Sequence, residues 1–194
     1  MDPFDYTFWL ASRAAGIVGF VALGVVSVLG LVSALRLVSP VTAARLRPWH
    51  ERLALTGLGC IAAHGLLLLA DPWLHPGVVG IVVPFQMGYR PVWTGLGIIA
   101  AYALAAFALS FYQRRRIGAR RWRSAHRFAS IAFVLGGLHA LMAGTDARSP
   151  LLLAIILGFG AVIGLMVAAR ALGLPAGRPV APRPARGAAA TTLK

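Results

Sequence analysis

Long apolar runs alternate with short polar connections along most of the chain. A helix needs about 20 apolar residues to cross a bilayer. Five runs reach roughly that length, at residues 8–37, 52–69, 92–112, 128–143 extended back to 124, and 151–172. The pattern predicts an all-α, polytopic membrane helix bundle with five transmembrane helices. Because Asp2 and Asp5, rather than basic residues, precede the first run, we expect a mature helix there and not a signal peptide.

Two segments fall outside these runs. The connection at residues 71–91 contains an apolar stretch, 77–85, that is too short to cross and is expected on the membrane surface or over the bundle. From residue 174 onward the chain consists mainly of Pro, Ala, Arg and Thr, which predicts a disordered cytoplasmic tail. The expected organisation is one transmembrane domain, 1–173, followed by a tail, 174–194.

Composition supports a membrane protein. Of the 194 residues, 59% are hydrophobic and 12% are charged, whereas a soluble domain is about half apolar and about a quarter charged. These proportions exclude an ordinary soluble enzyme. A single cysteine, Cys60, excludes a disulfide framework or an iron–sulfur cluster built from this chain alone.

The net charge of +14 predicts topology rather than a nucleic-acid partner, because the basic residues gather in alternate connections. They surround the first connection (Arg36, Arg45, Arg47, Arg52), the third (Arg114, Arg115, Arg116, Arg120, Arg121, Arg123, Arg127) and the end of the fifth run (Arg170, Arg178, Arg183, Arg186, Lys194). The positive-inside rule then places the N-terminus outside and the C-terminus in the cytoplasm of a plasma or inner membrane. Binding of an acidic partner or of nucleic acid is the alternative explanation for the third connection.

Four histidines occupy two of the predicted helices. His50 and His64 are fourteen residues apart on the second helix, and His126 and His139 are thirteen apart on the fourth. Both helices run outward from the cytoplasmic side, so at about 1.5 Å per residue each pair spans about 20 Å. His50 and His126 should therefore lie near the inner surface, and His64 and His139 near the outer one. Ionisable side chains inside a bilayer are costly and usually functional.

Two facing imidazoles are the axial ligand set of a haem iron. Zinc or copper would require three or four converging ligands, and neither level offers an obvious third. The sequence therefore predicts two bis-histidine haems b. They are expected to be non-covalent because no Cys-x-x-Cys-His motif is present. The alternative is a non-haem membrane module, a transporter or assembly factor, whose histidines carry protons or bind metal.

The thirteen-residue spacing raises a difficulty. At about 100° per residue, His126 and His139 are about 140° away from sharing one helix face. Either the fourth helix contains a π-bulge, as functional helices often do, or the two macrocycles are approached at different angles.

Other residues are candidates for contact with the cofactor. Gly57, seven residues from each histidine of its helix, would let a flat macrocycle approach, with small-residue helix packing as the alternative. Arg13 and Arg90 lie near the outer surface and are expected to pair with haem propionates, unless they extend to lipid headgroups. Phe133 either fills the space between the haems or belongs to the core. His75 is expected on the surface.

The histidine pattern, H-x13-H on one helix and H-x12-H two helices later, resembles the ferric reductase-like transmembrane domain family. This family includes ferric reductases, the NADPH oxidases and the haem-binding membrane subunit of periplasmic methionine-sulfoxide reductase systems. The resemblance covers about residues 8–172 and includes the stretches 64–71, 83–85, 89–93, 122–127 and 139–146.

The resemblance implies that His50 and His126 hold an inner haem b and that His64 and His139 hold an outer one. It also implies an arginine on the first helix, which favours Arg13, and electron transfer from the cytoplasm outward as the membrane component of an oxidoreductase. Larger members have six helices and a C-terminal module for FAD and NADPH. No Gly-rich dinucleotide loop follows a strand here. We therefore expect a separate cytoplasmic flavin reductase or other electron donor, and an acceptor, such as a protein, at the outer face.

Overall fold

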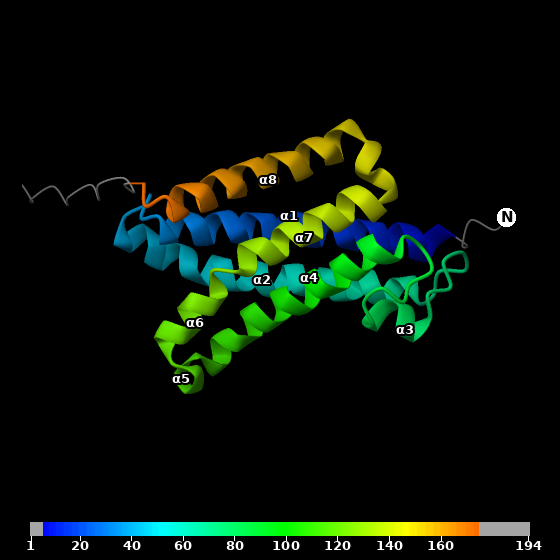
Figure 1. The fold of residues 1–194 in the computed structure, drawn as a ribbon, viewed down its shortest axis with the longest axis horizontal. Helices are drawn as coiled ribbons and strands as arrows, with labels where there is room; N and C mark the ends of the chain where they lie inside the picture. Colours follow the sequence, from blue (N-terminus) through cyan, green and yellow to red (C-terminus); the bar gives the residue numbers. More distant parts are fainter. Residues whose placement is uncertain (1–5, 175–194) are drawn as a thin grey trace, which may run out of the picture.

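The computed structural model describes residues 6–174, and all of their regular elements are helices (Figure 1). The elements are α1 (Thr7–Ala34), α2 (Pro40–Leu68), α3 (Gly77–Val82), α4 (Pro91–Leu109), η2 (Ser110–Gln113), α5 (Arg114–Ile117), α6 (Ala119–His126), α7 (Ala129–Ala143), η3 (Thr145–Arg148) and α8 (Pro150–Ala171). The predicted disordered tail lies outside the described residues, apart from Leu174, and remains a prediction.

Five helical segments are long and apolar enough to cross a membrane, which confirms the predicted fold class. They are Thr7–Ala34, Pro40–Leu68, Pro91–Ile117, Ala119–Ala143 and Pro150–Ala171. The second begins twelve residues before the predicted start at residue 52, because the helix continues through Pro48 and its neighbouring arginines. Its true start is at Ser39, whose side chain accepts a hydrogen bond from the backbone N–H of Thr42, with Pro40 in the first turn.

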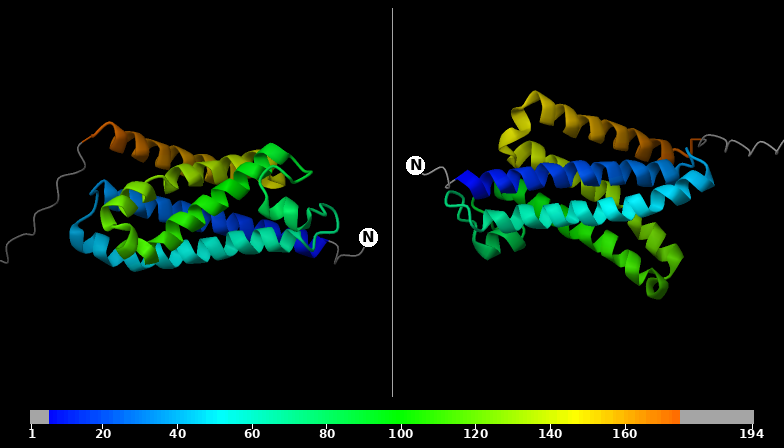
Figure 2. Two further views of the ribbon diagram at one scale, coloured as in Figure 1. Left: turned by 60° about the horizontal axis from the view of Figure 1, so that its bottom comes forward. Right: turned by 180° about the vertical axis from the view of Figure 1, so that it is seen from behind.

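The helices form two antiparallel hairpins and a covering helix. α1 packs along α2, α4 packs along α7, and α8 lies against α1 and α7 (Figures 1 and 2). The buried core joins α1, α7 and α8 and consists of Phe20, Leu23, Leu31, Phe133, Ile156 and Ile163. Phe20 and Phe133 stack with ring centroids 4.8 Å apart. Phe133 is therefore a core residue.

Glycines allow α1 and α2 to approach closely. A Cβ added to Gly57 would lie 2.8 Å from Cγ of Leu23, and one added to Gly19 would lie 2.9 Å from Cδ1 of Ile61. Small residues are commonly used for such contacts between membrane helices. Gly57 is therefore directed at α1. This contact agrees with the packing explanation for the glycine, and its role beside a cofactor remains a prediction.

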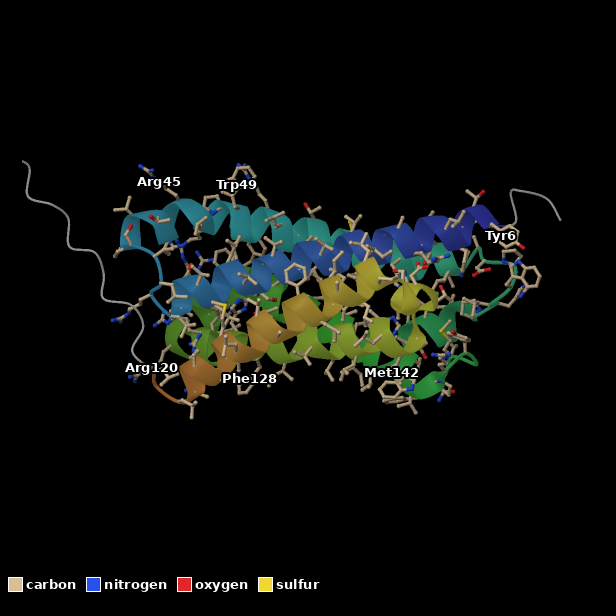
Figure 3. All side chains as sticks on the ribbon, turned by 90° about the horizontal axis from the view of Figure 1, so that it is seen from above. Tyr6, Arg45, Trp49, Arg120, Phe128 and Met142 are labelled. Atoms are coloured by element: carbon tan, nitrogen blue, oxygen red, sulfur yellow. The ribbon has the colours of Figure 1, made fainter. Side chains whose placement is uncertain are left out.

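The basic connections meet at one end of the bundle, as their alternation along the chain predicts. We call this end, formed by residues 35–52 and 114–127, the basic end. Figure 3 shows Arg45 and Arg120 there, and Tyr6 and Met142 at the opposite end. The apolar stretch expected over the bundle or on the membrane surface forms α3 at the opposite end, where the hydroxyl of Tyr102 donates to the carbonyl of Val82 over 2.5 Å.

Candidate functional site

The structure brings the four histidines together as two pairs. The ring centroids of His50 and His126 are 6.3 Å apart, and those of His64 and His139 are 6.4 Å apart. The angle between the ring planes is 69° in both pairs. Each pair joins α2 to the α6–α7 segment, although α2 and α7 otherwise have little direct contact. The same imidazole geometry is thus repeated at two levels between the hairpins.

An interruption between α6 and α7 explains how thirteen residues can separate two rings that both face α2. His126 is the last residue of α6, and α7 begins only at Ala129. The N–H of Phe128 bonds to the carbonyl of Ala125, and the N–H of Ile131 to the carbonyl of Phe128, both over 3.0 Å. These are tight, 3₁₀-type bonds, the opposite of a wide π-bulge. The expected π-bulge is therefore wrong, because a turn changes the helix phase instead.

Backbone carbonyls of neighbouring helices hold the two imidazoles at the opposite end. Nδ1 of His64 lies 2.8 Å from the carbonyl oxygen of Ser12, and Nδ1 of His139 lies 2.9 Å from that of Trp93. A carbonyl oxygen only accepts, so Nδ1 carries the proton and Nε2 keeps its lone pair for a metal. The hydroxyl of Ser12, which is fully buried, also donates to the backbone carbonyl of His64 over 2.8 Å.

The imidazoles at the basic end are held differently. The backbone of Val26 lies close enough to the imidazole of His50 for a polar interaction. The backbone of Phe107 lies similarly close to the imidazole of His126. Nδ1 of His126 is nevertheless buried without a partner of hydrogen-bond geometry among the described residues. This ring therefore needs another restraint on its orientation.

Two glycines on α1 make room for the histidines of α2. A Cβ on Gly16 would lie 3.0 Å from Nδ1 of His64, and one on Gly30 would lie 3.3 Å from Cε1 of His50. Both the glycines and the histidines are fourteen residues apart on helices that run antiparallel. These glycines are not among the residues predicted from the sequence, although their shared spacing with the histidines is a signal that could have identified them.

Gly97 of α4 serves His139 in the same way. A Cβ at this position would lie 2.5 Å from Nδ1 and 2.6 Å from Cγ of the imidazole. By contrast, a Cβ on Gly136, three residues before His139 on its own helix, would lie 3.9 Å from the Cβ of Ala100, an ordinary contact. The imidazole thus depends on a glycine of the neighbouring helix.

The two arginine candidates contact protein groups. Arg13 forms an ion pair with Asp146, to which its Nε donates over 2.6 Å, and its guanidinium lies 4.0 Å from the ring centroid of Trp9. Its anionic partner is therefore a carboxylate of this chain. Arg90 has a left-handed backbone, with φ of 45°, and donates to the carbonyl of Met142. Its side chain is exposed, unlike that of Arg13.

Each level offers two nitrogen donors. Among the described residues, no group of three or more His, Cys, Asp and Glu side chains is placed to hold a metal ion. His75, expected on the surface, is exposed and lies outside both pairs. Two facing imidazoles, which at the level of His64 and His139 both have Nδ1 bound to a backbone carbonyl, suit a group that is ligated from two opposite sides, as a haem is.

Comparison with protein families gives one match. The model described as "Ferric reductase like transmembrane component" matches residues 15–137, which is more than half of the chain and includes three of the four paired histidines. The comparisons with curated proteins and with solved structures give no match. A multi-pass helical bundle with this match belongs to the family of ferric reductase like transmembrane components.

Proposed function

We propose that the protein carries electrons across the membrane through two haems b, as the membrane component of a ferric reductase-like oxidoreductase. His50 and His126 hold the haem at the basic end, and His64 and His139 hold the haem at the opposite end. The observation that carries the proposal is the near-identical geometry of the two imidazole pairs in a chain of this family.

The separation of the rings fits one metal ion between them. Metal–imidazole bonds of about 2.0 to 2.1 Å, with about 1.1 Å from nitrogen to ring centroid, place two opposed imidazoles about 6.2 to 6.4 Å apart. The observed separations are 6.3 and 6.4 Å. Direct edge-to-face ring contact also spans about 4.5 to 7 Å. Ring contact alone, however, does not explain why two histidine pairs meet between α2 and the α6–α7 segment when α2 and α7 have little other contact.

A haem ligated by two histidines supplies one-electron transfer without an open position on the iron. The protein keeps the imidazoles neutral and oriented. At the opposite end, the backbone carbonyls of Ser12 and Trp93 accept hydrogen bonds from Nδ1–H of His64 and His139, which strengthens Nε2 as an electron-pair donor and fixes each ring. Glycines 16, 30 and 97 let the rings lie against their supporting helices.

The direction of transfer follows from charge. The basic end would face the cytoplasm, so that the N-terminus lies outside and the C-terminus inside a plasma or inner membrane. A separate cytoplasmic flavin reductase or other electron donor would reduce the haem of His50 and His126. His64 and His139 would hold the outer haem, which would supply electron transfer to an acceptor at the outer face, where an acceptor protein would dock. Lipid is the remaining partner, and we propose none among nucleic acids.

The arginines of the opposite end would have different roles. Arg90 is exposed and reaches the carbonyl of Met142, three residues beyond His139, which suits it to a propionate of the outer haem. Arg13, engaged by Asp146, would instead tie α1 to η3. The transmembrane domain, 1–173, would thus carry the whole electron path.

Substitution of single ligands tests the pairing. His64→Ala and His139→Ala should lose the same haem, and His50→Ala and His126→Ala should lose the other, as seen in reduced-minus-oxidised spectra and redox titrations. His75→Ala, the matched control outside both pairs, should retain two haems. Losses that follow the helix instead of the level, with His64→Ala matching His50→Ala, would show that the cross-helix pairing is wrong.

A further inference from the structure

The indole of Trp122 lies against one of the four paired imidazoles. Its ring centroid is 4.7 Å from that of His126, and the planes are inclined by only 21°. The two residues are four apart on α6, so they occupy neighbouring positions on one helix face. Among the described residues, none of the other three paired histidines has a stacked aromatic ring.

The indole is itself fixed from the preceding segment. Nε1 of Trp122 donates to Oγ of Ser110 over 3.2 Å. The ring of Phe111 contacts the indole edge-to-face, with ring centroids 5.7 Å apart. The guanidinium of Arg114 lies 3.8 Å from the ring centroid of Phe111. Residues of η2 and the start of α5, which follow α4, therefore fix the position of the Trp122 side chain on α6.

His126 also differs from His64 and His139 in its ring nitrogens. Its Nδ1 is buried without a hydrogen-bond partner among the described residues, whereas His64 and His139 each bond to a backbone carbonyl. An axial imidazole needs a fixed plane, which a hydrogen bond at the second ring nitrogen normally supplies. A stacked indole restricts the same rotation.

We propose that Trp122 is a positioning residue for His126, and that its stacked indole takes the place of the Nδ1 hydrogen bond that orients His64 and His139. The proposal rests on the proposed function, because it concerns the haem of the basic end. Aromatic pairing of this kind is worth about 2- to 10-fold in an equilibrium constant. Loss of the indole should therefore weaken the binding of the haem at this level by about that factor and leave the binding of the other haem unchanged.

The experiment uses the full-length protein with Trp122→Leu, Trp122→Phe and Ser110→Ala. Trp49→Leu is the matched control, since Trp49 lies at the same end but is 59% exposed and points away from the bundle (Figure 3). Haem content, the midpoint potentials and the low-spin ferric EPR signals are measured. The signals are assigned with His126→Ala and His64→Ala. The EPR signal reports the angle between the imidazole planes, which mere helix packing would not alter selectively.

We expect Trp122→Leu to shift the EPR signal and potential of the haem at the basic end only, and Trp122→Phe to restore most of the native signal. Ser110→Ala keeps the indole but removes its hydrogen bond, so it should give a smaller shift in the same signal. This variant tests the proposal if Trp122→Leu does not accumulate. Unchanged signals and potentials in these variants, or equal changes at both haems, would overturn the proposal. A wild-type protein that purifies without haem would instead overturn the proposed function itself.

Discussion

At the scale of single residues, the paired histidines are held by groups that carry no residue-type signature. The carbonyls of Ser12 and Trp93 that accept from His64 and His139 belong to the backbone. Any residue at these positions provides such a carbonyl. The spacing of the histidines therefore predicted which imidazoles meet, but nothing in the sequence could predict which helix would orient them.

Gly97→Ala should displace His139. The added Cβ would lie 2.5 Å from Nδ1 of the imidazole, which must move and weaken its bond to the carbonyl of Trp93. Overpacking of this kind costs about 1 to 3 kcal/mol. We expect the haem content to fall toward one per chain, with the same spectral loss as in His139→Ala, measured by reduced-minus-oxidised difference spectra.

Gly136→Ala is the control for this variant. Gly136 lies three residues from His139 on α7, but its added Cβ would meet only Ala100, at 3.9 Å. Both haems should be retained. Equal haem loss in the two variants would mean that any added methyl group near His139 disturbs the site, and that Gly97 has no special role.

At the scale of elements, the apolar runs predicted each transmembrane helix. The predicted helix ends were wrong where the chain is polar but still helical. The start of α2 was missed because Pro48 and nearby arginines end the apolar run, although the helix, capped by Ser39, runs through them. The turn at Arg127 and Phe128 was missed because residues 124–131 contain neither Gly nor Pro. The spacing of the histidines showed that the phase must change, but not by what means.

One alanine inserted between Arg127 and Phe128 should separate His126 from His50. An extra residue turns α6 by about 100° relative to α7, while His139 remains on an unchanged helix. We expect the haem at the basic end to be lost and the other haem to be retained. Redox titration of the purified protein measures both.

The control insertion is placed after Gly118, an exposed residue between α5 and α6 with φ of 91°. The connection can absorb the extra residue there, so both haems should remain. If the insertion after Arg127 also leaves both haems in place, the turn does not set the phase of His126.

At the scale of the whole molecule, the two hairpins are built alike. In each, the second helix provides the histidines and the first supports them, α1 for α2 and α4 for the α6–α7 segment. The apolar runs predicted five crossings, and the alternation of basic connections predicted that these connections gather at one end. The side of the membrane that this end faces is a further step that rests on the positive-inside rule.

Reporter fusions test that orientation. With the basic end in the cytoplasm, a reporter after Lys194 should be active only if it functions in the cytoplasm, and one fused after Ala147 should be active only if it functions outside. Activity of both fusions on the same side would contradict the five-crossing topology. Exchanged activities would reverse the inner and outer haems.

The haem content of the purified full-length protein tests the central claim most directly. Two imidazole pairs of matching geometry predict two non-covalent haems b per chain, and a pyridine haemochrome assay against protein concentration measures this ratio. We expect a ratio near two, with all of the haem extractable by acidic acetone. A ratio near one would mean that one pair does not bind haem, and a ratio near zero would contradict the proposed electron path altogether.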